Sequence, residues 1–153
     1  MKTALTTLGG WTVEFGDESR TSGQKEDVLP CLARLFTENG SGRIVISEDV
    51  GGRSWLPRLL GLAPRISQMH LAIEWSSDVA SLIFFDDAAS EYRAKDPERP
   101  IQTDEDTRRA IAHGELKPHP LDECLGLVRA REAIQEFMRT GDRPNWLQYE
   151  YVH

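Results

Sequence analysis

The last 21 residues, AIQEFMRTGDRPNWLQYEYVH (Ala133–His153), carry the clearest structural pattern in the chain. Apolar side chains recur at helical spacing as far as Met138. Gly141 and Pro144 then end the helix, because glycine accepts a left-handed cap and proline cannot continue a helix. Asn145–Val152 alternates, with Leu147, Tyr149 and Tyr151 on one side. We predict a C-terminal helix, begun near Pro120 or restarted after Gly126, followed by a terminal strand.

The centre of the chain predicts an antiparallel β-hairpin. In Gln68–Trp75 alternate residues are apolar. The side expected to face the core consists of Met69, Leu71, Ile73 and Trp75, and the opposite side of Gln68, His70, Ala72 and Glu74. After a turn at Ser76–Asp78, Val79–Phe85 is apolar on both faces, as expected of a central strand with helices over one side.

The rest of the chain adds shorter elements. Strands are predicted at 11–15, 42–47 and 91–94, and helices at 24–39 and from Thr103. In the first helix Asp27 is the expected N-cap, which leaves Pro30 in the first turn. Residues 49–64 are interpreted as a loop with one short helical turn. Together these elements predict a single α+β domain over residues 1–153, an antiparallel sheet with helices packed on one face.

Composition limits the function. The chain has 153 residues, a net charge of -7 and a pI near 5.1, which argues against unaided binding to nucleic acid. Cys31 and Cys124 belong to no paired motif, so we interpret both as buried apolar residues of a protein in the reducing cytoplasm. No signal peptide and no membrane span are predicted.

Catalytic motifs are not apparent. The sequence contains no nucleophile elbow, phosphate-binding loop or dinucleotide fingerprint. His113 and His119 lie in a Gly- and Pro-containing connector and favour a solvated loop over a metal site. Asp86 and Asp87 are adjacent at a strand end, where their side chains point to opposite faces. We therefore expect no catalytic residue, no metal and no cofactor.

The acidic residues are concentrated in one stretch. From Glu74 to Asp106 there are ten acidic residues and three basic ones, whereas the rest of the chain has 15 of each. This excess favours either a solubilising face or a docking surface for a basic partner, whose association it would accelerate. A protein that acts on nucleic acid presents such a basic cleft.

The C-terminal stretch resembles the first-numbered family of immunity proteins in bacterial polymorphic-toxin systems. The matching positions are Ala133, Ile134, Phe137, Thr140, Gly141, Pro144 and Tyr149, where the family more often has Trp at the position of Tyr149. The hairpin with Trp75, Phe84, Phe85 and Asp86 is similar to the family more loosely. The resemblance implies an α+β domain encoded beside a toxin, often a deaminase that acts on nucleic acid, and inhibition by covering its active site.

The leading functional expectation is therefore a cytoplasmic, non-enzymatic immunity protein that binds a cognate toxin domain 1:1. The contact surface is expected to include Glu74, Asp78, Asp86, Asp87, Glu91 and Tyr92. Trp75 is assigned either to this surface as an aromatic anchor or to the core, as a continuation of the strand's apolar side. The alternatives are a small metal-dependent hydrolase or nuclease using Asp86, Glu91 and Lys95, and a non-catalytic regulatory module without a toxin partner.

Overall fold

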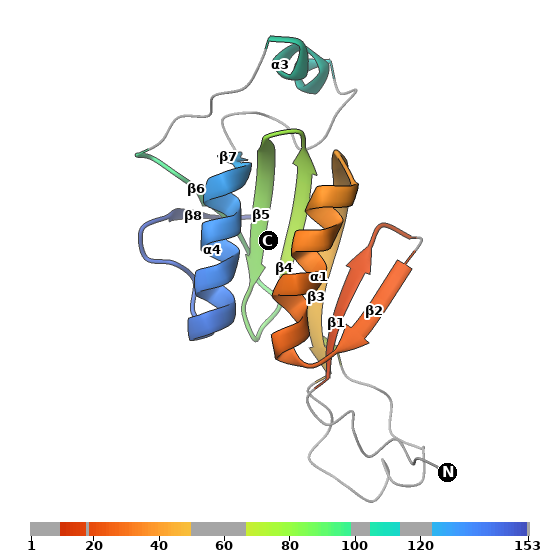
Figure 1. Ribbon diagram of the computed structural model, residues 1–153. Helices are drawn as coiled ribbons and strands as arrows, with labels where there is room; N and C mark the ends of the chain where they lie inside the picture. Colours follow the sequence, from red (N-terminus) through yellow and green to blue (C-terminus); the bar gives the residue numbers. More distant parts are fainter. Residues whose placement is uncertain (1–9, 18, 50–66, 99–104, 114–123, 153) are drawn as a thin grey trace, which may run out of the picture.

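The computed structural model describes residues 10–17, 19–49, 67–98, 105–113 and 124–152 (Figure 1). Its elements are β1 (Trp11–Phe15), β2 (Ser19–Gly23), α1 (Lys25–Glu38), β3 (Ser41–Asp49), β4 (Ser67–Ser76), β5 (Val79–Phe85), β6 (Glu91–Lys95), α3 (Glu105–Ala112), β7 (Leu125–Gly126), α4 (Leu127–Thr140) and β8 (Gln148–Tyr151). Seven strands form one open antiparallel sheet in the order β2-β1-β3-β4-β5-β6-β8, and the two-residue β7 pairs with β5. The predicted α+β class is confirmed.

The helices α1 and α4 lie across the same face of the sheet, so the fold has two layers (Figure 1). The predicted hairpin is confirmed as β4 and β5, with Leu71 opposite Phe84 and Trp75 opposite Ala80. The strand β2 was not predicted, because its sequence SRTSG contains no apolar residue. It pairs with β1 at one edge of the sheet, where a strand needs no buried side.

The core lies between the helical layer and the sheet. The sheet contributes buried side chains such as Ile44, Ile73 and Leu82, each fully inaccessible to solvent. From the helices come Val28, Leu32 and Leu35 of α1 and Ala130, Ala133, Ile134, Phe137 and Met138 of α4. Burying an aliphatic side chain of this size contributes about 1.5–3 kcal/mol, so this layer is the main source of stability.

A β-bulge in β4 reverses the predicted facing of two residues. Ile46 pairs with Leu71 and Ser47 with Met69, so His70 is the extra residue of the bulge. Met69, expected to face the core, is 44% exposed. His70, expected on the polar side, instead stacks on Trp11 with ring centroids 4.9 Å apart. Its Nε2 lies 2.9 Å from the Glu48 carboxylate, a partner that lets the ring pack among aromatic side chains.

The helix starts differ from the predicted ones. The N-cap of α1 is Gln24, and Asp27 is its third residue: the Asp27 carboxylate accepts a hydrogen bond from the Gln24 amide at 2.8 Å, completing a capping box. Pro30 is therefore inside the helix rather than in its first turn. It costs one backbone hydrogen bond on an exposed face, where water can satisfy the free carbonyl. At α4, the restart after Gly126 is the correct alternative.

The C-terminal unit closely follows its prediction. Gly141 adopts the left-handed conformation at φ 79° and its amide donates to the Phe137 carbonyl at 2.8 Å. The terminal strand is shorter than expected, at Gln148–Tyr151, because Asn145 and Trp146 form a turn and Leu147 a bend before it. The expectations for 49–64 fall almost entirely outside the described residues, as do those for Thr103 and His119.

Two further predictions concern the burial of the cysteines and the presence of membrane-spanning helices. Cys124 is buried but Cys31 is only partly so, and both are free thiols. Within the described ranges, no helix combines the length and apolarity needed to cross a bilayer.

Candidate functional site

The structure distributes the seven predicted contact residues over four places. Asp78 lies in the turn at one end of the β4–β5 hairpin, and Asp86 follows β5 at the other end. Because the seven residues of β5 separate them, these two positions are about 25 Å apart. Glu74 lies on the sheet face opposite the helices, and Trp75 lies beneath them. The residues Asp86, Asp87, Glu91 and Tyr92 lie at the same end of β5 and β6, and we call them the β5–β6 end surface, although Glu91 and Tyr92 are adjacent in β6 and project to opposite faces of the sheet.

Trp75 belongs to the core and is excluded from any contact surface. Its side chain is 1% exposed, with the Phe36 ring edge-on at 4.8 Å and the Phe15 ring at 5.9 Å. Its indole N–H donates to the Asn39 carbonyl at 3.2 Å. The bulky ring therefore ties β4 to α1 and to the turn that follows α1.

Glu74 and Asp78 are each engaged away from the β5–β6 end surface. The Glu74 carboxylate lies 3.7 Å from Arg43 Nε on the neighbouring strand. The backbone carbonyl of Asp78 accepts a hydrogen bond from Leu127 N at 2.6 Å, which joins the hairpin turn to the start of α4. These two residues do not form one continuous surface with Asp86 and Asp87.

Asp86 organises the turn between β5 and β6. Its Oδ1 accepts hydrogen bonds from the amides of Ala88 at 2.9 Å and Ser90 at 2.8 Å, and its Oδ2 lies 3.4 Å from the Tyr92 hydroxyl. The hydrogen bond from the Ser90 amide is the largest cause that lowers the pKa of Asp86, with the Ala88 amide adding to it. Asp86 is thus a turn-forming residue whose charge remains fixed at neutral pH.

Asp87 and Glu91 are the other two carboxylates near this turn. Asp87 is exposed and its Oδ1 accepts a hydrogen bond from Gln68 Nε2 at 2.7 Å, whereas Glu91 is partly buried, as Asp86 is. Glu91 is opposite Phe85 in the ladder, and its backbone carbonyl accepts from the Val152 amide at 2.8 Å. Replacing the Asp87 or Glu91 side chain therefore removes a charge and leaves the backbone of the turn intact.

Beside these carboxylates lies a group of aromatic and basic side chains, Tyr92, Arg143, Tyr149 and Tyr151, which we call the tyrosine–arginine cluster. The Arg143 guanidinium lies 4.1 Å from the Tyr92 ring centroid and 4.8 Å from that of Tyr149. Tyr92 and Tyr151 are cross-strand partners with ring centroids 5.7 Å apart. Tyr and Arg are enriched where proteins bind one another. Sequence reasoning found only Tyr92, because Arg143 and the C-terminal tyrosines meet it through the pairing of β6 with β8.

Tyr149 has a perturbed ionisation. Burial raises its pKa to about 12, an effect that Arg143 partly opposes. Its hydroxyl donates to the Pro144 carbonyl at 2.6 Å.

We expect this raised pKa to make Tyr149 a source of alkaline instability. Above pH 10 the unfolded chain loses the tyrosine proton while the folded protein keeps it, so stability falls as pH rises toward 12. The Tyr149→Phe variant has no hydroxyl to ionise, so it does not show this loss of stability at high pH. In urea unfolding it should be less stable than wild type by about 1 kcal/mol at pH 8, from the lost hydrogen bond. The difference in free energy of unfolding between wild type and Tyr149→Phe should become smaller by pH 11. A difference that stays constant with pH would contradict the raised pKa of Tyr149.

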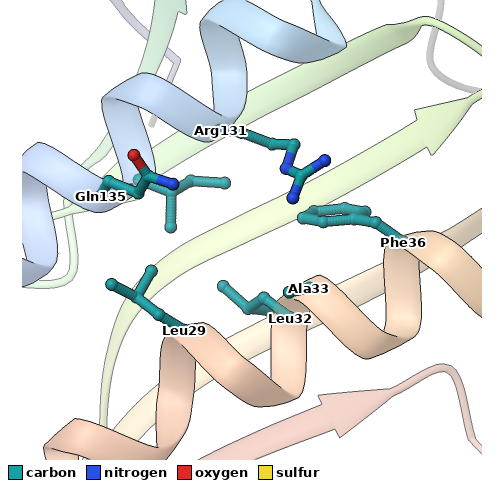
Figure 2. Close-up of a pocket in the computed structure, with 7 residues that line it drawn as sticks. Leu29, Leu32, Ala33, Phe36, Arg131 and Gln135 are labelled. Atoms are coloured by element: carbon teal, nitrogen blue, oxygen red, sulfur yellow. The ribbon is translucent and has the colours of Figure 1, made fainter.

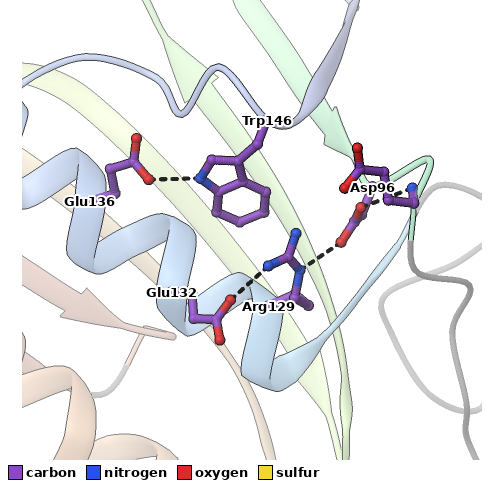
Figure 3. Close-up of polar contacts among 6 residues, drawn as sticks. Asp96, Arg129, Glu132, Glu136 and Trp146 are labelled. Atoms are coloured by element: carbon purple, nitrogen blue, oxygen red, sulfur yellow. Dashed lines mark hydrogen bonds and ion pairs between the residues drawn. The ribbon is translucent and has the colours of Figure 1, made fainter.

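A polar network joins α4 to the end of β6 and to the segment before β8 (Figure 3). Arg129 of α4 donates to Asp96 at 2.8 Å and to Glu132 at 2.8 Å, and the Asp96 side chain is only 2% exposed. The guanidinium stacks 4.0 Å above the Trp146 ring, whose N–H donates to Glu136 at 2.7 Å. These contacts fix the end of β6 and the segment before β8 against α4. The network therefore has a structural role.

A surface groove lies between the two helices (Figure 2). It is shallow and open, with a volume of about 40 Å³, and apolar side chains such as Leu29, Leu32 and Ile134 form most of it. Arg131 extends over the Phe36 ring at 5.8 Å. No acidic or nucleophilic side chain lines this groove, which therefore offers packing surface rather than reactive groups.

The alternative hydrolase site does not assemble. Lys95 Nζ lies 2.6 Å from Glu150, and Lys95 is at the opposite end of β6 from Glu91, about 13 Å along the strand. Asp86 is occupied by backbone amides of its own turn. These three side chains do not converge on one reacting bond. Among the described residues, no three His, Cys, Asp or Glu side chains are grouped as metal ligands.

The positions behind the C-terminal resemblance have structural roles. Ala133, Ile134 and Phe137 are buried on the inner face of α4, and Pro144 is buried in the segment that follows. The Thr140 hydroxyl donates to the Glu136 carbonyl at 2.9 Å. Comparisons of the chain with models of known protein families, with curated proteins and with solved structures gave no match.

Proposed function

We propose that this protein is an immunity protein that binds a cognate bacterial toxin domain in a 1:1 complex and neutralises it by covering a basic, nucleic-acid-binding active site. The observation that carries the proposal is the β5–β6 end surface, where the Asp86 carboxylate adjoins Tyr92 of the tyrosine–arginine cluster and the exposed Asp87 follows it in the turn. The expected toxin is a deaminase or nuclease. The protein itself acts without a catalytic residue or cofactor, in the cytoplasm where the toxin is made.

The surface has the chemistry that such an inhibitor needs. Carboxylates that are already held in place can pair with the Lys and Arg side chains that otherwise bind phosphates. Asp86 is held by two backbone amides and Tyr149 by the Pro144 carbonyl, so little side-chain entropy is lost on binding. The net charge of -7 favours fast association with a basic partner.

Reversing charge at this surface is expected to slow association. Asp87→Lys combined with Glu91→Lys should lower the association rate constant for the toxin about tenfold or more at low salt, and the difference should shrink as salt is added. Asp86 is avoided in this test because its carboxylate forms the turn. Stopped-flow or surface-binding kinetics gives the rate.

Asp87→Lys and Glu91→Lys are also measured singly, and Glu38→Lys is the matched control for each of them, because Glu38 is exposed and lies at the C-terminal end of α1, remote from the β5–β6 turn. An equal slowing by this control would mean that net charge, rather than the β5–β6 end surface, sets the rate. Unchanged kinetics in the double variant would remove this surface from the interface.

The function itself is tested by co-expression with the product of the gene immediately upstream, with an affinity tag on one of the two proteins. The proposal predicts a stable 1:1 complex and survival of cells that otherwise die from the neighbour. Failure to co-purify together with failure to rescue would reject it.

A further inference from the structure

The strand β8 forms one edge of the sheet. It pairs with β6 on its inner side, and among the described residues no strand pairs with its outer side. Three of its four residues are exposed, and Tyr151 at 64% is one of the most exposed large apolar side chains. An edge strand of this kind presents unpaired backbone groups that can hydrogen-bond to an added strand.

The ladder identifies which backbone groups point outward. The Val152 amide donates to the Glu91 carbonyl at 2.8 Å, so this pair is a hydrogen-bonded one. Hydrogen-bonded and non-hydrogen-bonded pairs alternate in an antiparallel ladder, and Glu150 opposite Arg93 is therefore the next bonded pair. The N–H and C=O groups of Tyr149 and Tyr151 consequently point away from β6. Their spacing of two residues is the repeat with which a strand adds to a sheet edge.

The side chains beside this edge provide selectivity. Tyr149 and Tyr151 lie on the same side as Tyr92, with Arg143 stacked on two of the three rings. The Asp86 carboxylate, next to Tyr92, places negative charge near them. The opposite edge strand, β2, has the sequence SRTSG and offers no apolar residue for such contacts.

We propose that the β8 edge binds an extended segment of a partner protein by β-strand addition, and that this segment carries a Lys or Arg next to an apolar residue. The basic residue pairs with the carboxylate of Asp86, which lies beside Tyr92, and the apolar residue packs on Tyr151. Backbone hydrogen bonds from Tyr149 and Tyr151 supply affinity, while the tyrosine–arginine cluster selects the side chains. The inference rests on the proposed function, since the partner is the toxin encoded by the neighbouring gene.

Substitutions at Tyr151 separate the backbone contribution from that of the ring. Tyr151→Pro removes an outward-pointing N–H that β6 does not use, and proline is tolerated at that position of an edge strand. Tyr151→Val keeps the N–H and removes the ring. With the purified toxin as the probe, we expect the dissociation constant to rise about 30-fold or more for Tyr151→Pro and several-fold less for Tyr151→Val. Melting temperatures of the free variants check that both are folded.

Amide hydrogen exchange on wild type gives a second measurement that needs no variant. The amides of Tyr149 and Tyr151 should exchange quickly in the free protein and become protected in the complex. If a tight complex forms while both amides stay unprotected and Tyr151→Pro binds like wild type, strand addition is wrong and the proposed function survives. If wild type does not bind the toxin, both proposals fail. Protection that rises with the concentration of the free protein would assign the edge to a second copy of this chain, and would overturn a partner segment.

Discussion

Alanine in place of Trp75 is expected to lower the free energy of unfolding by about 3–5 kcal/mol, the range for removing a large aromatic side chain from a core. The ring is 1% exposed and lies between the Phe15 and Phe36 rings, so its loss leaves a cavity that joins β1, α1 and β4. The Asn39 carbonyl also loses its indole donor. Urea denaturation monitored by far-UV circular dichroism measures the change.

Trp75→Phe is the matched variant, because it keeps an aromatic ring and loses the indole N–H. It should cost about 1–2 kcal/mol, less than half the effect of alanine. If Trp75→Ala were as stable as wild type, Trp75 would lie outside the core. It would also reopen the possibility that the ring contacts a partner.

A methyl group at Gly42 is expected to destabilise the protein by about 2–3 kcal/mol, because overpacking a filled core forces its side chains off their preferred rotamers. Gly42 is the cross-strand partner of Trp75, and the rings of Phe15 and Trp75 fold over its missing side chain. A Cβ at Gly42 would lie 2.7 Å from Trp75 Cη2 and would overlap the Phe15 ring. Both rings are held by neighbours, so neither can move away without cost.

Gly40→Ala is the control, since a Cβ at Gly40 meets no atom within 4 Å. It should change stability by less than about 0.5 kcal/mol. The double variant Gly42→Ala with Phe15→Leu should recover part of the lost stability by making room for the methyl group. Equal effects of alanine at Gly40 and Gly42 would contradict the close approach of the two rings.

Most of the sheet could be predicted because its strands bury one side. The alternation of apolar and polar residues predicted β1 and β4, and a run that is apolar on both faces predicted β5. Gly141 and Pro144 predicted the end of α4. The strand β2 and the bulge at His70 could not be predicted, because a polar edge strand has no apolar pattern and a bulge interrupts alternation without a residue type of its own. The N-cap of α1 was predicted wrongly because Pro30 was expected to lie in the first turn of the helix. The capping box at Gln24 stabilises an earlier start, in spite of the cost of a proline inside the helix.

The candidate surface could be predicted only in part. Asp86, Asp87, Glu91 and Tyr92 are close in sequence and stay close in the structure. Asp78 is equally close in sequence, but a seven-residue strand carries it to the far end of the hairpin. Arg143 and Tyr151 join the surface from the C-terminal segment, and only the pairing of β6 with β8 brings them there. Charge patterning along the sequence contains no information of that kind.

The most direct test of the proposed function is a titration of the upstream gene product's activity on nucleic acid with this protein. If this protein covers the active site, the toxin's activity should fall linearly and reach zero at one molar equivalent. The nucleic-acid substrate should compete with this protein for the toxin. Full toxin activity in the presence of a several-fold excess of this protein would contradict the proposal.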